Sequence, residues 1–433
     1  MHPALAMRPD LNDRALLKAR FSRIRAQTEG LTQGLAPEDM QVQTMDDVSP
    51  MKWHLAHTSW FFEAFLLQPL IKGYQPFDPV FDYLFNSYYE AVGERWSRAR
   101  RGLLTRPLVD EVLRYRAYVT AQVERAIETM DEALWHQGAP IIELGLNHEQ
   151  QHQELACSDI KHVLAVSPLP HGPYPRPEEL PHKSEALGEM AFMAFEGGLV
   201  EVGAVAGSGF VYDNELPRHT VYLYPFELAQ RPVSNGEWLN FMADGGYQRA
   251  EFWLSEGWAM VQGERLQAPL YWRQIAGEWH EYTLHGPQKL DPDQPVCHIS
   301  GYEAAAYANW AGARLPLEAE LELLAHCAPP EGRLLFNQPG VHPARMQAGD
   351  GLQAVYGGVW EWTQSAYSAY PGYHPPKGAV GEYNGKFMAS QWVLRGGSCA
   401  TPYDHVRASY RNFFPPSARW QFSGLRLARD LSA

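Results

Sequence analysis

The stretch NHEQQHQEL, residues 147–155, places His148 and His152 four positions apart. On a helix, side chains at this spacing lie on one face, one turn from each other. Both imidazoles can then reach a single metal ion, although such a pair is also common on an ordinary solvated helix face. A metal site therefore requires at least one further ligand from another part of the chain.

A third histidine is available in WHLAHTSWFFE, residues 53–63, which offers both His54 and His57. His57 lies three residues before Trp60 and four before Phe61, so it shares the expected buried stripe with these rings, whereas His54 falls toward the edge of the helix. We therefore expect His57 to be the third ligand; a shift of one turn would favour His54. Three imidazoles without a carboxylate suit a divalent metal such as Fe(II), Zn(II), Ni(II) or Co(II). They leave positions open for substrate and oxygen on iron, or for water on zinc.

The elements that must position these histidines lie in the first 166 residues, which have the pattern of long amphipathic helices. The four predicted helices cover residues 10–31, 49–67, 106–130 and 140–166. They predict an all-α four-helix bundle, a fold that builds metal sites from side chains on facing helices. A long aromatic loop, residues 74–102, joins the second helix to the third, and long loops of this kind are often functional.

The chain changes character after the bundle, so we expect a multidomain protein. Residues 167–187 are rich in proline and polar residues and are predicted to be a linker. Residues 188–433 contain short apolar runs interrupted by glycine, proline and tryptophan, which predict an α+β domain with much irregular structure. Within them, residues 300–327 are expected to form two short helices.

The composition excludes several classes of partner. The 433 residues carry a formal charge of −14, which disfavours nucleic acid and anionic membranes. The four cysteines are widely spaced, which suits a reducing compartment, and neither a secretory signal nor an apolar membrane-spanning stretch is visible. We expect a cytoplasmic protein that acts on small molecules.

Several motifs carry a resemblance to known families. The first half resembles the DinB-like metal-binding bundle in HLAHTSWFFE and NHEQQHQE. The second half resembles the formylglycine-generating-enzyme fold, which is C-type-lectin-like, in DNELPRHTVYLYPFELAQRPVSNGEW, RLPLEAELE, GGVWEWTQS and LRGGSCATP. Both halves in this order resemble the EgtB-type sulfoxide synthases of ergothioneine biosynthesis. This resemblance implies a non-haem Fe(II) enzyme that uses O2 to join a thiol to C2 of hercynine, N-α-trimethylhistidine, as a sulfoxide. It implies that His57, His148 and His152 bind the iron.

The resemblance also assigns residues that bind hercynine and the thiol. Gln151 matches a position that hydrogen-bonds the substrate imidazole, and Asn412 matches one that holds the betaine end. Phe413 stands where some members carry tryptophan and would offer an aromatic face to the trimethylammonium group, although it also fits simple core packing. Phe414 stands where members that use γ-glutamylcysteine carry aspartate. An apolar ring cannot pair with the additional charged groups of that thiol, so we expect free L-cysteine as the sulfur donor.

Two arginines and two tyrosines complete the implied site. Arg98 and Arg101 match the paired arginines of the family and would bind the carboxylate of the thiol substrate, because a guanidinium suits bidentate contact. A solvated basic turn is the alternative, and the neighbouring Arg95 or Arg100 could take either role. Tyr88 and Tyr89 resemble an active-site tyrosine pair, in which a phenol delivers a proton or hydrogen atom and favours sulfoxide over sulfinate.

Several alternatives remain open from the sequence. Other members of the family place the working tyrosine in the second half, where Tyr367 and Tyr370 are the candidates. A formylglycine-generating enzyme would need a cysteine pair near RGGS, where only Cys399 is present. The other candidates are a zinc-dependent DinB-type thiol transferase, a non-enzymatic scaffold and an ovothiol-type synthase that acts on unmethylated histidine. Ovothiol-type proteins usually carry an additional methyltransferase domain, which is absent from these 433 residues, so a betaine-lined pocket is expected.

Overall fold

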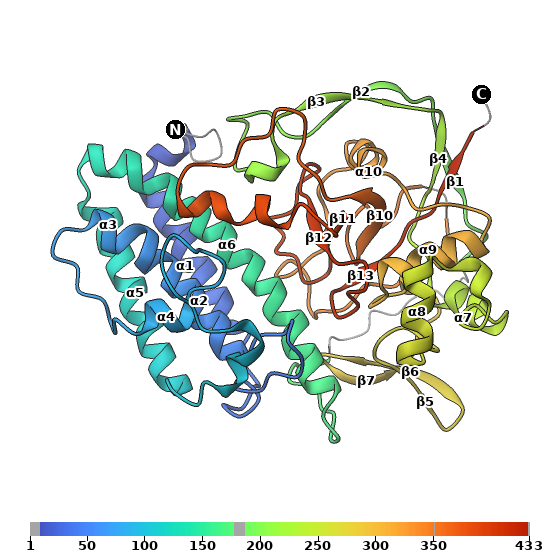
Figure 1. Ribbon diagram of the computed structural model, residues 1–433, viewed down its shortest axis with the longest axis horizontal. Helices are drawn as coiled ribbons and strands as arrows, with labels where there is room; N and C mark the ends of the chain where they lie inside the picture. Colours follow the sequence, from blue (N-terminus) through green and yellow to red (C-terminus); the bar gives the residue numbers. More distant parts are fainter. Residues whose placement is uncertain (1–8, 177–186, 350, 432–433) are drawn as a thin grey trace. The chain divides into compact units, whose positions relative to one another are not determined.

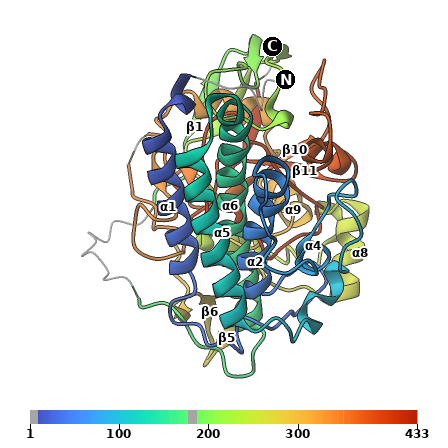
Figure 2. The same ribbon diagram turned by 90° about the vertical axis from the view of Figure 1, so that its left-hand side faces the viewer.

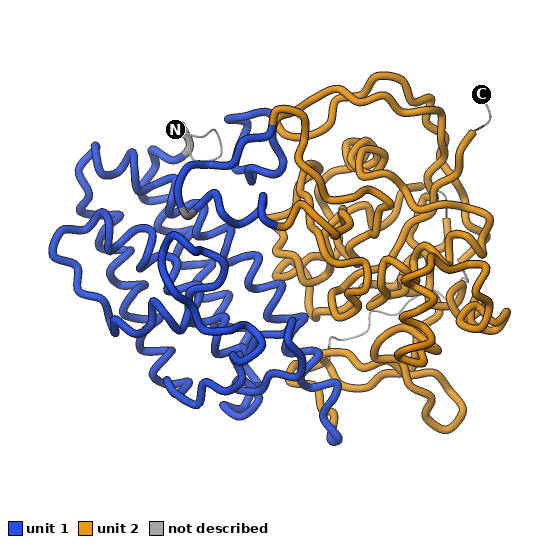
Figure 3. Tube along the Cα trace, viewed as in Figure 1, with its two compact units in different colours: residues 1–169, 205–216, 373–386 blue, residues 170–204, 217–372, 387–433 orange. Residues whose placement is uncertain are grey.

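The computed structural model describes residues 9–176, 187–349 and 351–431, and the chain forms two compact units (Figure 3). The helical unit contains residues 1–169 together with 205–216 and 373–386. The mixed unit contains residues 170–204, 217–372 and 387–433. Residues 177–186 of the predicted linker lie outside the described residues, and the predicted boundaries at 166 and 187 stay predictions.

The helical unit is the four-helix bundle that the sequence predicted. Its helices lie side by side and pack on one another through buried apolar residues (Figures 1 and 2). The four helices are α1 (Arg14–Gly30), α2 (Met51–Phe62), α5 (Val109–Thr129) and α6 (Glu132–Ala165). Asp13 caps α1 by accepting a hydrogen bond from the backbone N–H of Leu16, as its side chain type and position favour.

Helix α6 begins eight residues earlier than the sequence predicted. The prediction placed its start at Pro140, because proline is favoured in the first turn of a helix and disfavoured inside it. In the structure Pro140 lies inside α6, and Asp131 provides the N-cap by accepting from the N–H of Leu134. The aspartate cap and the buried Trp135 therefore outweigh the one backbone hydrogen bond that the proline removes.

Helix α2 occupies the centre of the bundle, and every one of its residues is buried. It continues as a π-helical turn, η3 (Glu63–Leu67), and a short α3 (Gln68–Leu70). The aromatic loop that follows contains two short helices, α4 (Phe81–Phe85) and η4 (Arg98–Leu103). The remaining short helices that begin in this unit are η2 (Pro9–Asn12), η5 (Asp213–Glu215), η7 (Ala379–Glu382) and η8 (Asn384–Phe387).

The mixed unit contains short strands and helices, in agreement with the predicted α+β class. Its strands are β1 (Phe192–Phe195), β2 (Gly198–Val202), β3 (His219–Leu223), β4 (Phe226–Ala229), β5 (Trp272–Ile275), β6 (Glu278–Thr283), β7 (Gly286–Lys289), β8 (Gly332–Arg333), β9 (Tyr356–Gly357), β10 (Trp360–Ala366), β11 (Trp392–Arg395), β12 (Asn412–Phe414), β13 (Ser423–Gly424) and β14 (Ala428–Asp430). Its helices are α7 (Asn235–Ala243), η6 (Ala250–Phe252), α8 (Ser255–Glu264), α9 (Gly301–Trp310) and α10 (Glu318–Ala325).

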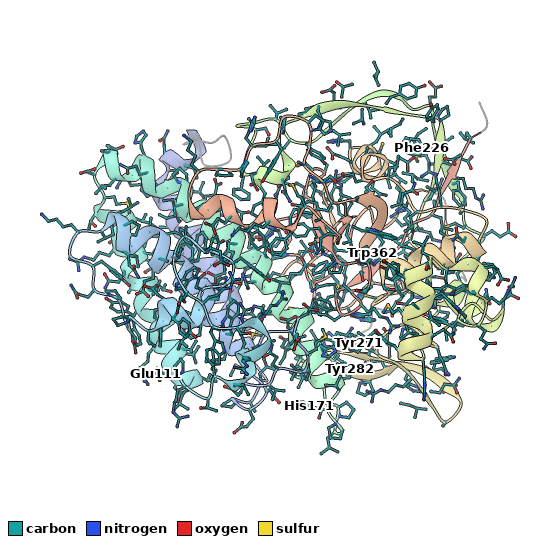
Figure 4. The ribbon with its side chains drawn as sticks, viewed as in Figure 1. Glu111, His171, Phe226, Tyr271, Tyr282 and Trp362 are labelled. Carbon is teal, nitrogen blue, oxygen red and sulfur yellow. The ribbon has the colours of Figure 1, made fainter. Side chains whose placement is uncertain are left out.

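The largest sheet of the mixed unit has the order β12-β11-β10-β13. Strands β10 and β11 are antiparallel, with Glu361 opposite Arg395, whereas β10 and β13 are parallel. Trp362 of β10 lies in the interior of this unit (Figure 4), and its indole N–H donates to the carbonyl oxygen of Ile299 at 2.9 Å. The other sheets have two or three short strands, with the orders β1-β4-β14, β2-β3, β5-β6-β7 and β8-β9.

Helices α9 and α10 confirm the two short helices predicted for residues 300–327, whereas α7 and α8 were not predicted. Both missed helices are short, and α7 starts from a capping box in which Ser234 and Glu237 exchange hydrogen bonds with each other's backbone N–H. In the part of the chain that the structure describes, no helix has the length and apolar character needed to cross a membrane.

Candidate metal centre

Three histidines meet inside the helical unit, one from α2 and two from α6. One ligand nitrogen from each of His57, His148 and His152 lies within 4.8 Å of the others. The Nε2 atoms of His57 and His148 are 3.2 Å apart, and the ring centroids of His148 and His152 are 4.6 Å apart. His57 and His148 are buried, and His152 is half-buried. The predicted choice of His57 over His54 agrees with this arrangement.

The orientation of His57 is fixed on three sides. Its Nδ1–H donates to the carbonyl oxygen of Phe85 at 2.6 Å, which leaves the lone pair on Nε2, directed to the other two rings. The indoles of Trp53 and Trp60 stack on the imidazole, with centroid separations of 4.5 and 5.3 Å. A carbonyl partner and two flat neighbours therefore set both the tautomer and the plane of this ring.

The other two rings have different surroundings. The ring of Phe61 stacks on His148 at 4.6 Å, and His148 Nδ1 is buried without a hydrogen-bond partner among the described residues. The Nδ1 atom of His152 lies 2.9 Å from Nδ1 of His54, the histidine that the sequence placed at the helix edge. His54 is thus outside the triad and contacts one of its members.

The electrostatics of the triad favour neutral imidazoles. Burial lowers the pKa of His148 to about 3. Burial, the neighbouring imidazoles and the positive charge of Arg101 also lower the pKa values of His57 and His152 well below the ordinary range. A metal ion needs the lone pair of a neutral imidazole, so this donor set fits a divalent transition metal. None of the three neutral ligands offsets the positive charge of a bound metal ion. That charge would therefore be available to attract a substrate anion.

A buried ion network holds the other face of α6. Glu149, the residue after His148, accepts hydrogen bonds from Arg25 of α1 at 3.0 Å and from Arg116 of α5. Arg25 also donates to Ser59 of α2 at 2.9 Å. The Glu149 carboxylate on α6 is thereby linked directly to α1 and α5 and, through Arg25, to α2. Each charged group of the network has an opposite charge as a partner, as burial of charge requires.

A small cavity opens beside His148 within the helical unit. Its volume is about 40 Å³, which is enough to hold water molecules. Gln151 and Tyr89 line it, and their roles toward substrate stay predictions. Its other walls come from Phe61, Leu144, Val211, Tyr212, Asp213, Pro376, Val380, Tyr383 and Asn384.

The two predicted tyrosines have different positions. Tyr89 is buried against Phe65, at a centroid distance of 5.0 Å, and burial raises the pKa of its phenol. Tyr88 is half-buried, and its hydroxyl accepts a hydrogen bond from Arg98 at 2.7 Å. Of these two tyrosines, Tyr89 lines the cavity beside His148 and Tyr88 does not.

The two predicted arginines both lie in the helical unit, but only Arg101 is buried. Its guanidinium lies 3.3 Å from the ring centre of Trp53 and donates to the hydroxyls of Ser49 at 2.9 Å and Ser87 at 3.1 Å. The Nε atoms of Arg98 and Arg101 make no hydrogen bond within the described residues. Each guanidinium therefore keeps donor capacity for a ligand.

The three remaining predicted residues belong to the mixed unit, on β12. Phe413 stacks on Tyr367, with ring centroids 4.0 Å apart and an interplanar angle of 8°. Asn412 accepts a hydrogen bond from the backbone N–H of Phe413 at 2.9 Å, and Phe414 contacts Trp420 edge to face at 5.7 Å. The roles of Asn412, Phe413 and Phe414 toward substrate stay predictions.

Two family models match the chain. The DinB superfamily model matches residues 20–156, and the sulfatase-modifying factor enzyme 1-like domain matches residues 177–334 and 340–431. The hercynine oxygenase of Mycobacterium tuberculosis is 30% identical over 407 residues, which cover 89% of this chain and 92% of the relative. The hercynine oxygenase of Mycolicibacterium smegmatis is 32% identical over 415 residues, with the same two shares.

The chain belongs to the hercynine oxygenase family. The formylglycine-generating enzyme of Streptomyces coelicolor is 30% identical, but its match covers only 54% of this chain. That share is too small to include both the DinB region and the sulfatase-modifying factor region. Cys399 is buried and is the one cysteine near RGGS in the sequence, so the cysteine pair expected there of a formylglycine-generating enzyme is absent. Membership in the hercynine oxygenase family makes the chain an oxygenase rather than a scaffold.

The sequence did not predict every residue of the centre of this hercynine oxygenase family member. Asp213 and Asn384 come from two short segments of the second half that join the helical unit, and the Asn384 side-chain N–H donates to Asp213 at 2.5 Å. The hydroxyl of Tyr373 donates to the same carboxylate at 2.9 Å. Asp213 is the first residue of the motif DNELPRH, which we used above only as a mark of the fold. The same motif could also have indicated that Asp213 is a polar residue of the site.

Proposed function

We propose that the protein is a non-haem Fe(II) sulfoxide synthase that joins the thiol of L-cysteine to C2 of hercynine. The reaction removes one hydrogen from the imidazole C2 and one from the thiol. One oxygen atom of O2 is placed on sulfur, and the other leaves as water. His57, His148 and His152 would hold the ferrous ion, which when bound would pass electrons from the two substrates to O2.

The observation that carries this proposal is the buried cluster of three neutral imidazoles beside a largely apolar cavity into which Gln151 and the phenol-bearing Tyr89 also face. Neutral rings suit a divalent metal, and the absence of a carboxylate from the triad leaves room for a thiolate ligand. The named relatives are hercynine oxygenases, which supports hercynine as the second substrate.

The chain's own residues would bind and orient the thiol substrate. We propose that Arg101, assisted by Arg98, binds the carboxylate of L-cysteine through a charge-assisted hydrogen bond. The hydroxyls of Ser49 and Ser87 and the ring of Trp53 hold the Arg101 guanidinium in place. A preorganised guanidinium loses little conformational entropy when the substrate binds.

Gln151 and Tyr89 would act on the reacting groups. The amide of Gln151 can hydrogen-bond the imidazole of hercynine, which orients C2 toward the thiol. Burial raises the pKa of Tyr89, so its phenol stays protonated at neutral pH and can deliver a proton or hydrogen atom at its hydroxyl oxygen. Tyr88 is the second candidate for this step.

Asn412 and Phe413 would hold the betaine end of hercynine. A trimethylammonium group cannot donate a hydrogen bond, so it is best bound by an aromatic face. The Phe413 ring is held flat against Tyr367. Phe414 offers no charge for the additional groups of γ-glutamylcysteine, which favours L-cysteine as the donor.

The direct test is mass spectrometry of products after anaerobic loading with Fe(II) and exposure to L-cysteine, hercynine and O2. The proposal predicts the hercynine–cysteine sulfoxide and one oxygen atom from ¹⁸O2 in the product. Binding of one zinc ion with no O2 uptake would instead support a thiol transferase. Conversion of histidine in preference to hercynine would support an ovothiol-type synthase.

A further inference from the structure

A chain of three polar side chains leads away from the metal centre within the helical unit. Nδ1 of His152 lies 2.9 Å from Nδ1 of His54, and Nε2 of His54 lies 3.0 Å from Oδ2 of Asp159. His54 belongs to α2, whereas His152 and Asp159 are seven residues apart on α6. His54 and Asp159 are each 3% exposed, so water does not compete for these contacts.

The proton positions along this chain follow from the donor capacity of each group. A carboxylate only accepts hydrogen bonds, and Oδ2 of Asp159 accepts from the backbone N–H of Ser49 at 2.8 Å. It therefore accepts from Nε2–H of His54 as well. A neutral His54 with its hydrogen on Nε2 has a lone pair on Nδ1, which can only accept. The hydrogen between the two imidazoles then belongs to Nδ1 of His152.

This assignment leaves the lone pair of His152 on Nε2. His57 has the same tautomer for a different reason, because its Nδ1–H donates to the carbonyl oxygen of Phe85. Two of the three rings are thus held by an acceptor behind Nδ1, one from the backbone and one from another histidine. An outer partner of this kind fixes the tautomer and the ring orientation of a metal ligand and increases its basicity.

We propose that His54 and Asp159 are positioning residues that hold His152 as an Nδ1–H tautomer with Nε2 free to bind a metal ion. This inference rests on the proposed metal centre and assigns a function to the histidine of WHLAH that is not a ligand. His54 provides the acceptor for His152, and Asp159 determines which nitrogen of His54 carries the hydrogen. The backbone N–H of Ser49 fixes the carboxylate in turn.

The test is titration of the apo protein with Co(II), followed by the visible absorption of the bound ion. His54→Leu removes the acceptor, and we expect it to weaken Co(II) binding by roughly ten- to a hundredfold. His54→Asn keeps an acceptor, because the amide oxygen can occupy the position of Nδ1, so it should recover most of that loss. In Asp159→Leu, His54 can carry its hydrogen on either nitrogen. This variant should therefore weaken Co(II) binding by an amount between those of the two His54 variants.

A matched control is available on the same helix. His162 of α6 is also buried, lies ten residues beyond His152 on the same helix, and has its Nδ1 2.6 Å from the hydroxyl of Thr44. His162→Gln should bind Co(II) with the affinity of the unsubstituted protein. Thermal melting of each apo variant identifies any substitution that prevents folding, in which case the His54→Asn and Asp159→Leu titrations still test the inference.

Two outcomes would overturn the inference. One is a His54→Leu variant that binds Co(II) as tightly as the unsubstituted protein, and the other is a His54→Asn variant that binds no more tightly than His54→Leu. A His152→Leu titration separates these failures from failure of the metal centre. If His152→Leu retains full Co(II) affinity, the three-histidine centre itself is wrong.

Discussion

Oε2 of Glu149 lies 3.0 Å from Nη1 of Arg25, one residue along α6 from the metal-ligand candidate His148. Successive residues of a helix point about 100° apart, so α6 presents the histidines on one face and this carboxylate on another. Arg116 pairs with the same carboxylate, and Glu149 and both arginines are at most 2% exposed. The rotation of α6 that directs His148 and His152 to the centre is therefore coupled to a buried ion network.

Removal of the Glu149 charge should destabilise the apo protein strongly. Glu149→Gln leaves the buried Arg25 without its counter-charge and Arg116 with Glu29 as its remaining partner, which we expect to lower the free energy of unfolding by about 3–5 kcal/mol. Urea denaturation measures this loss. Glu128→Gln, which removes an exposed partner of Lys18, is the control and should change stability little. Equal effects of the two substitutions would contradict the role given to the network.

The apo protein should lose stability as the pH falls below about 6.5, the ordinary pKa of histidine. Burial lowers the pKa of His148 to about 3 in the folded chain, so between these values only the unfolded chain binds this proton. Stability then falls with decreasing pH, by about 1.4 kcal/mol per pH unit for one such histidine. Thermal melting at a series of pH values measures the slope, which should be shallower for His148→Gln. Equal slopes would contradict the assignment.

The spacing of His148 and His152 was enough to predict that they share a face, because helix geometry fixes that relationship locally. The choice between His54 and His57 was harder, because all residues of α2 are buried and no apolar stripe distinguishes one face. The contact of His54 with Asp159 depends on how two helices pack, which local pattern does not determine.

Long-range contacts explain the other differences. Asp213 and Asn384 reach the cavity beside His148 through segments 205–216 and 373–386, which lie far from the bundle in sequence. Nothing in the periodicity of those segments indicates that they join the helical unit. The start of α6 was misplaced for a local reason, since Pro140 is a stronger signal in sequence than the aspartate cap that precedes it.

Replacement of Tyr89 by phenylalanine should change the products. Loss of the phenol removes the proposed source of a proton or hydrogen atom, so we expect more cysteine sulfinate and less sulfoxide. Liquid chromatography with mass spectrometry gives the ratio of the two products. Tyr83→Phe is a matched control because Tyr83 is 38% exposed and does not line the cavity. If Tyr88→Phe changes the ratio and Tyr89→Phe does not, Tyr88 takes this role.

Arg101→Ala should weaken the use of cysteine more than that of hercynine. Loss of a charge-assisted hydrogen bond to the carboxylate corresponds to roughly a ten- to hundredfold lower kcat/KM for L-cysteine. Steady-state kinetics with each substrate varied in turn separates the two effects. Arg95→Ala is the control, because Arg95 is more exposed and pairs with Glu90. A loss confined to hercynine would exclude Arg101 as the carboxylate ligand.

The sulfur donor should be free L-cysteine. Because Phe414 is apolar, we expect kcat/KM for L-cysteine to be well above that for γ-glutamylcysteine. Phe414→Asp adds a charge for the ammonium group of the longer thiol and should narrow the difference. Comparable values for the two thiols in the unsubstituted protein would refute this specificity.

X-ray absorption spectroscopy at the iron edge, on protein loaded anaerobically with Fe(II), tests the three-histidine centre most directly. We expect one iron per chain with scattering from three imidazole rings, and from two rings after His57→Gln. An unchanged spectrum in that variant, or iron surrounded mainly by carboxylate oxygen, would contradict a three-histidine centre.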